Sequence, residues 1–98
     1  MSQAIWSPEA ILELEEVAFY IAVHDGRPAT ADRIVREAHD LGDLIATQPE
    51  MGAVHPEFGA GYRAVSFKKR WFIVYRKAAD GIKVLRFVDG VRDYGQLF

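Results

Sequence analysis

The carboxyl-terminal third of the chain carries the residue types best suited to bind a charged partner. Arg63, Arg86 and Arg92 lie on or just after expected strands. Their planar guanidinium groups can form paired hydrogen bonds with phosphate or carboxylate groups. The same region contains the aromatic residues Trp71, Phe72, Tyr75, Phe87, Tyr94 and Phe98.

Basic residues interleaved with aromatic ones can bind single-stranded nucleic acid by stacking and charge. The alternative is that the aromatic residues form the core face of a sheet, which we expect for Trp71, Phe72 and Phe87. For Tyr94 and Phe98, near the end of the sequence, both interpretations stay open.

The sequence lacks the residue patterns of metal binding, nucleophilic catalysis and phosphate-binding loops. His24, His39 and His55 have no second ligand at helical spacing, which argues against a metal site. The chain has no cysteine, so a disulfide, a thiolate metal site and a cysteine nucleophile are excluded. The serines lie in no G-x-S-x-G motif, and the glycines form no phosphate-binding loop. We therefore predict no catalytic residue, metal, cofactor or small-molecule substrate.

The two parts of the chain differ in charge. Residues 1–60 hold three basic and eleven acidic residues, whereas residues 61–98 hold nine basic and three acidic residues. One interpretation is that the basic part faces an anionic partner. The other is that the two parts attract each other within the fold.

Length and composition predict one globular domain. The chain has 98 residues, of which 50% are hydrophobic and 27% charged, so we expect a single domain over 1–98. No apolar run approaches the roughly 20 residues of a membrane span, and Met1–Ser7 does not resemble a signal peptide. We expect a cytoplasmic protein without a membrane partner.

The first half predicts a short strand followed by two amphipathic helices. Residues 3–6 form the strand, and Ser7 caps a helix that ends near His24-Asp25-Gly26. A second helix begins after Thr30, its expected cap, and ends before Pro49. Because the connection is short, the helices should form an antiparallel hairpin. Their apolar stripes comprise Ala10, Leu14, Val17 and Ile21, and then Ile34, Ala38, Leu41 and Ile45.

The last third predicts three strands. Residues 62–67, 71–77 and 82–88 alternate or are β-rich, with turns at Lys68-Lys69-Arg70 and Asp80-Gly81. Strict alternation places Phe87 on the side opposite Val84. The expected class is α+β, in the order β-α-α-β-β-β, with an antiparallel sheet packed against the helical hairpin. The connection Pro49–Gly61 has no evident role.

Several short motifs, taken in order, resemble the ParE/RelE superfamily of toxins from type II toxin–antitoxin systems. They are Trp6-Ser7-Pro8-Glu9-Ala10, Gly61-Tyr62-Arg63, the strand Trp71–Arg76 and the ending Phe87-Val88-Asp89-Gly90-Val91-Arg92-Asp93-Tyr94. The resemblance covers essentially the whole chain and implies the fold order given above.

The resemblance implies one of two activities. RelE-like toxins cleave mRNA on the ribosome with basic residues and an acid/base side chain, whereas ParE-like toxins stabilise the cleaved complex of DNA gyrase. Here Val65 and Phe72 stand where RelE-like chains have basic residues, and Phe98 falls near their acid/base tyrosine. The ParE-like branch is favoured, although Asp89 replaces the histidine of many ParE-like chains. The alternatives are an mRNA interferase that uses Arg63, Lys68, Lys69 and Arg92, and an inactive binding module.

The resemblance also implies a cognate antitoxin that binds the helical hairpin. We expect the antitoxin to contact the apolar seam formed by Leu14, Val17, Ile21, Ile34, Ala38 and Leu41. We expect the target, DNA gyrase or its DNA, to contact Arg63, Arg86, Arg92, Asp93, Tyr94 and Phe98.

Overall fold

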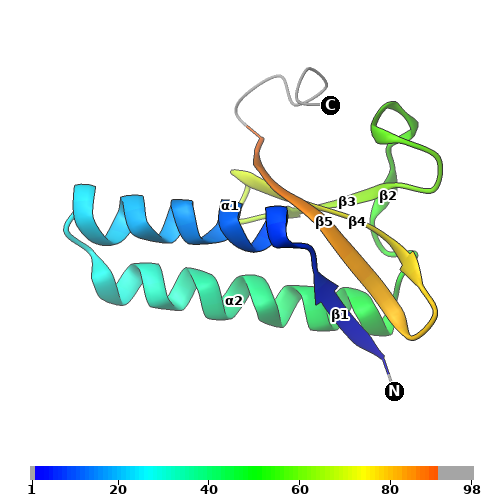
Figure 1. The fold of residues 1–98 in the computed structure, drawn as a ribbon, viewed down its shortest axis with the longest axis horizontal. Coiled ribbons are helices and arrows are strands. Elements are labelled where there is room, and N and C mark those ends of the chain that lie inside the picture. Colours follow the sequence, from blue (N-terminus) through cyan, green and yellow to red (C-terminus); the bar gives the residue numbers. More distant parts are fainter. Residues whose placement is uncertain (1, 91–98) are drawn as a thin grey trace.

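The computed structural model describes residues 2–90, which form two helices against one face of a five-stranded sheet (Figure 1). This confirms the expected α+β class. The elements are β1 (Gln3–Trp6), α1 (Pro8–Phe19), the π-helical turn η1 (Tyr20–His24), α2 (Pro28–Thr47), β2 (Ala53–Val54), the 3-10 turn η2 (Pro56–Phe58), β3 (Arg63–Phe67), β4 (Trp71–Ala78) and β5 (Gly81–Asp89). No helix within this part of the chain is long and apolar enough to cross a membrane.

The helices begin at prolines. Ser7 caps α1, because its hydroxyl oxygen accepts a hydrogen bond from the amide of Ala10 at 3.1 Å. The same hydroxyl donates to the carbonyl of Leu85 at 2.9 Å, which ties the helix start to β5. The second helix begins at Pro28 and not after Thr30, so the predicted cap is wrong. Proline at the first helical position has its φ preset for the helix, and its missing amide leaves one donor fewer to cap.

The strand order in the sheet is β1-β5-β4-β3-β2. The pairs formed by β2, β3, β4 and β5 are antiparallel, while β1, which precedes both helices in the chain, runs parallel to β5. Strand β2 lies inside the connection Pro49–Gly61, where the sequence predicted no strand; two residues are too few to show alternation.

A β-bulge changes the sidedness of β5. Ile73 pairs with Phe87, and Tyr75 pairs with Val84, so β5 has one residue more than β4 between these pairs. Phe87 and Val84 consequently lie in the same core cluster. The prediction that they face opposite sides of the sheet is wrong, because strict alternation assumes a strand without a bulge.

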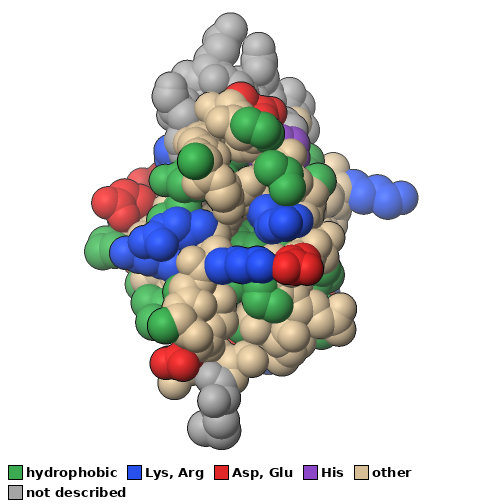
Figure 2. Space-filling model, turned by 90° about the vertical axis from the view of Figure 1, so that its right-hand side faces the viewer, with side chains coloured by type: hydrophobic (Ala, Val, Ile, Leu, Met, Phe, Trp, Pro, Cys, Tyr) green, Lys and Arg blue, Asp and Glu red, His purple; other side chains and the backbone are tan. Residues whose placement is uncertain are grey.

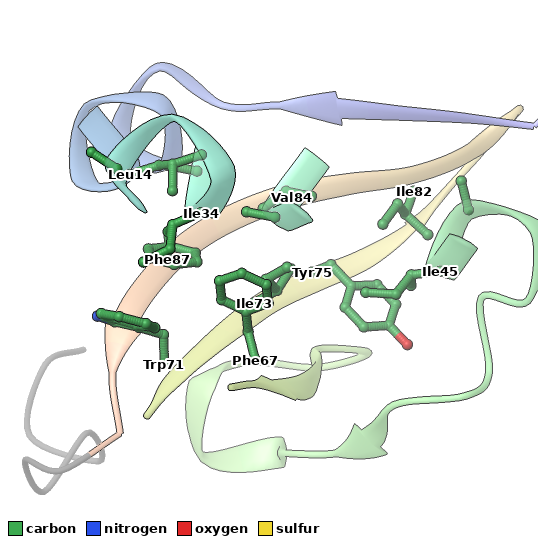
Figure 3. Packing of buried hydrophobic residues seen from close by; sticks show 14 of the residues in the cluster. Leu14, Ile34, Ile45, Phe67, Trp71, Ile73, Tyr75, Ile82, Val84 and Phe87 are labelled. Atoms are coloured by element: carbon green, nitrogen blue, oxygen red, sulfur yellow. The ribbon is translucent and has the colours of Figure 1, made fainter. Parts of the chain in front are cut away.

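The main core lies between the helices and the sheet (Figure 3). Leu14 and Ile34 of the helices meet Ile73, Val84 and Phe87 of the central strands (Figure 3). Trp71 and Phe87 are 6% and 2% exposed, which confirms their expected place in the core. A smaller cluster comprises Phe58, Ala64, Val74 and Val88, with Tyr62 and Phe72 packed against it.

Candidate partner-binding surfaces

Arg86, expected to contact a target, is held by the first helix. Its Nε donates to both carboxylate oxygens of Glu13, at 3.0 and 2.9 Å. The hydrogen bond that the Arg86 guanidinium donates to Glu13 raises the pKa of this guanidinium above its usual value. Glu13 also accepts the amide hydrogen of Phe87 at 3.0 Å. Strand β1 pairs with β5 only as far as Val84, so this amide has no partner in β1. This arginine joins the sheet to the helical layer.

Arg63 is also engaged within the fold. Its Nη1 donates to the carbonyl of Gly52 at 2.8 Å and, less closely, to that of Glu50 at 3.3 Å. The side chain is half-buried at the start of β3. It holds the beginning of the connection Pro49–Gly61 against the sheet while leaving some donors on its guanidinium for a partner.

Further ion pairs join the acidic and basic parts of the chain. Lys68 lies 3.0 Å from a carboxylate oxygen of Glu37, and Lys77 lies 2.6 Å from one of Glu50. The hydrogen bonds from these lysines lower the pKa of both carboxylates. Together with the pair of Arg86 and Glu13, these pairs show that the acidic and basic parts of the chain attract each other within the fold. This was one of the two interpretations of the charge asymmetry.

The residues expected to bind the antitoxin pack the core. Four of them are at most 9% exposed: Leu14, Ile21, Ile34 and Ala38. Val17 and Leu41 are partly buried and pack against the same core cluster. Their side chains hold the hairpin on the sheet. A partner that approaches this hairpin from solvent therefore meets other residues first.

An exposed apolar stripe lies on the outer side of the first helix and its continuation. Leu12, Phe19, Tyr20 and Val23 are 56%, 68%, 51% and 64% exposed. Sequence reasoning missed these residues because they lie off the stripe that faces the sheet. The signal that could have found them is the presence of large apolar residues on the charged side of the helix, at spacings of seven and four.

A groove borders this stripe. It has a volume of about 520 Å³ and lies between the first helix with η1 and the strands β4 and β5. Tyr20, Trp71 and Phe87 contribute apolar surface to its wall. Its charged lining combines four acidic residues with two arginines: Glu13, Glu16, Asp25, Asp89, Arg70 and Arg86. The groove and the stripe share Tyr20, so they form one continuous surface, hereafter the helix-side surface.

The connection Pro49–Gly61 is fastened by a buried tyrosine. The Tyr75 hydroxyl donates to the carbonyl of Pro49 at 2.8 Å and accepts the amide hydrogen of Gly52 at 2.9 Å. Burial raises the pKa of this phenol above its usual value. A Cβ on Gly52 would lie 2.6 Å from the hydroxyl oxygen, so the loop needs glycine there. The connection, which had no predicted role, supplies β2 and anchors the sheet edge.

The histidines do not converge. His39 lies with its ring 4.7 Å from that of Trp6, His24 stacks on Tyr20, and His55 pairs with Glu57. Within residues 2–90 no group of three or more potential ligands could hold a metal ion. The other predicted target contacts, Arg92, Asp93, Tyr94 and Phe98, lie outside the described residues.

The family model for the ParE toxin of the type II toxin–antitoxin system parDE matches residues 4–94. The chain belongs to the ParE toxin family. A toxin of a type II system has an antitoxin as its partner, so the ParE family membership implies that partner here. The match covers both helices, strands β2 to β5 and all of β1 except its first residue.

Solved structures show the same fold for this ParE family member. A chain from the chromosomal ParDE TA system from P. aeruginosa superimposes with a TM-score of 0.74 at 20% identity, covering 91% of this chain and 96% of that one. A conserved hypothetical protein, HP0894 from Helicobacter pylori, gives a TM-score of 0.50 at 16% identity, with both chains fully covered. A search of curated protein sequences gives no significant match.

Proposed function

We propose that this ParE family toxin acts on DNA gyrase by stabilising its cleaved complex, and that its cognate antitoxin neutralises it through the helix-side surface. The target assignment rests on the match of the ParE family model over residues 4–94. Within the described residues, the chain also lacks the set of basic and acid/base side chains that a RelE-like nuclease uses. Such a toxin needs to bind its target without making or breaking a bond itself.

The placement of the basic residues argues against phosphodiester cleavage. Arg63 begins β3 and Lys68 follows its end, so about 16 Å of extended chain separates them. Lys68 pairs with Glu37, and Arg63 donates to backbone carbonyls. The separation of these two cations and their engagement within the fold argue against their joint binding of one scissile phosphate, which the interferase alternative requires.

The positions that distinguish RelE-like chains also have structural roles. Val65 packs against the main core, and Phe72 packs against the smaller cluster. Neither side chain can move a proton. Without an acid or base near the reacting atoms, cleavage loses a contribution of roughly 10²–10⁴-fold.

The helix-side surface is the best support for an antitoxin site. It combines large exposed apolar side chains with a groove, a combination typical of surfaces that receive an amphipathic helix. Glu15 and Glu16 lie on the exposed side of the same helix. The antitoxin segment that fits here has apolar anchors, with basic residues toward the glutamates of the helix and an acidic residue toward Arg70.

The target is tested by a supercoiling assay with purified gyrase and by mRNA cleavage on programmed ribosomes, run with one toxin preparation. The expected result is loss of supercoiling at micromolar toxin with intact mRNA. Unaffected gyrase together with cleaved mRNA would favour the interferase alternative and contradict the proposal.

The antitoxin site is tested by calorimetric titration of the cognate antitoxin into Phe19→Ala. Phe19 is 68% exposed, so its truncation should leave the fold intact while weakening binding about tenfold or more. Leu44→Ala is the matched control, because Leu44 is 47% exposed on the other helix. Equal affinities for the two variants would place the antitoxin elsewhere.

A further inference from the structure

A hollow whose lining includes no acidic residue lies where β4 extends past the first residue of β3. Pairing between these strands stops at Arg63 and Tyr75, whereas β4 continues to Ala78. The hollow has a volume of about 410 Å³ and is lined by Ala60, Gly61, Arg63, Arg76 and Lys77. The cations Arg63, Arg76 and Lys77 thus share one small concave site.

Two like charges oppose each other beside this hollow. Arg76 of β4 pairs in register with Lys83 of β5, and both lie on the sheet face away from the helices, since their neighbours Tyr75 and Val84 lie in the main core. Like charges directly opposite each other destabilise a sheet. Neither side chain forms an ion pair with any residue in 2–90, in contrast to Lys77, which pairs with Glu50.

Figure 2 shows this side of the molecule, with Lys and Arg side chains in a band across it, one acidic side chain directly beside the band and other acidic side chains further away. We propose that the hollow and the adjoining Arg76–Lys83 pair bind the phosphodiester backbone of a nucleic acid. An anion here relieves the cross-strand repulsion, which no protein group among the described residues does. The inference stands whether or not gyrase is the target.

The chemistry favours nucleic acid over an acidic peptide. Arg76 and Lys83 begin on neighbouring strands, and the hollow lies beside Arg76 on the side of β3, so the site spans about 10 Å. A nucleic-acid strand carries one charge in every backbone unit, about 3.4 Å apart along a duplex axis, and so presents several phosphates over that span. A peptide must order flexible carboxylate side chains to do the same, which costs conformational entropy. The guanidinium fork also matches phosphate geometry.

The test is fluorescence anisotropy of a fluorescein-labelled DNA duplex against salt between about 50 and 200 mM. The wild-type chain should bind with a log–log salt slope of about −2 to −3, as expected for two to three neutralised phosphates. The double variant Arg76→Gln, Lys83→Gln should lose about two units of that slope and about tenfold in affinity at low salt.

The charge-matched control is Lys68→Gln with Lys69→Gln. Lys68 and Lys69 lie in the turn at the opposite end of β4. Their substitution removes two positive charges, as the Arg76 and Lys83 substitutions do. The control should keep the wild-type slope; circular dichroism of all variants shows that they are folded. Equal slopes for the two double variants would overturn the proposal, as would DNA binding that is undetectable even at low salt.

Competition distinguishes the possible sources of the anion. Unlabelled DNA should displace the probe far more effectively than inorganic phosphate or a polyglutamate peptide of equal charge. Polyglutamate competing as well as DNA would overturn the choice of a nucleic-acid ligand. Occupation by inorganic phosphate without binding of the duplex would overturn the assignment of a backbone site.

Discussion

Replacing Glu13 with alanine should strongly destabilise the fold while barely changing its surface. The Glu13 carboxylate accepts hydrogen bonds from the Arg86 guanidinium and from the backbone amide of Phe87. The side chains of Arg86 and Glu13 are 28% and 22% exposed, so the pair is largely shielded from water. Alanine leaves both donors without this acceptor.

The magnitude follows from the two donors. Loss of charge-assisted hydrogen bonds to a shielded arginine costs about 1.5 kcal/mol at the low end of its range, and an unsatisfied amide adds about 1 kcal/mol. The low values apply because the site keeps some contact with solvent. The total of about 2.5 kcal/mol corresponds to a decrease in Tm of about 10 °C for a chain of this size.

The assay is thermal and urea denaturation followed by circular dichroism, with Glu15→Ala as the matched control. Glu15 is exposed on the same helix, so its replacement removes the same charge with almost no change in Tm. Glu13→Gln should fall between the two, because its amide oxygen can still accept one hydrogen bond. A Glu13→Ala variant as stable as Glu15→Ala would refute the structural role of this pair.

The remaining predictions concern stability at other sites. Tyr75→Phe should lower the free energy of unfolding by about 2 kcal/mol in a urea titration, since the amide of Gly52 loses its buried acceptor. The raised pKa of Tyr75 adds stability that is complete below about pH 10 and is lost as the pH rises through the folded value; the variant should lack this alkaline dependence. Gly81→Ala should fail to fold or lose β1, judged by amide exchange, because a Cβ would lie 2.0 Å from the backbone of the neighbouring strand. Lys68→Met should flatten the acid limb of the stability curve below about pH 4, because Lys68 holds the pKa of Glu37 low and that stability is lost as the carboxylate is protonated.

The sidedness of β5 depended on a contact that local sequence does not reveal. Residues 82–88 alternate as an ordinary strand does, and yet the bulge brings Phe87 to the same face as Val84. The hydrogen bonds that Glu13 and Ser7 of the first helical segment make with β5 accompany this irregularity. They join residues more than 70 positions apart, so a pattern read over a short stretch of sequence could not predict them.

Helical periodicity identified the core stripe correctly, while the expectation that the antitoxin contacts this stripe stays a prediction. An apolar face can pack on the chain's own sheet or on a partner, and the period is the same in both cases. In so small a domain the sheet needs that face, as the burial of Leu14, Ile34 and Ala38 shows. The exposed side chains of Leu12 and Phe19 became evident only when the packed face was known.

The charge asymmetry was visible from the sequence, but the sequence did not show which basic residues pair with acidic ones within the fold. Counting residues cannot tell that Arg86 and Lys68 pair with acidic side chains of the helices while Arg76 and Lys83 do not. That division depends on strand register and on how the helices cross the sheet. It moves the proposed anion-binding surface away from Arg86, one of the residues first expected to contact a target.

The measurement closest to the central claim is accumulation of cleaved DNA by gyrase in the presence of this toxin. Reactions trapped with detergent and digested with protease should show linear plasmid that increases with toxin and disappears when the cognate antitoxin is added first. Plasmid that stays uncleaved at micromolar toxin, under conditions where a known gyrase poison yields linear product, would contradict the account.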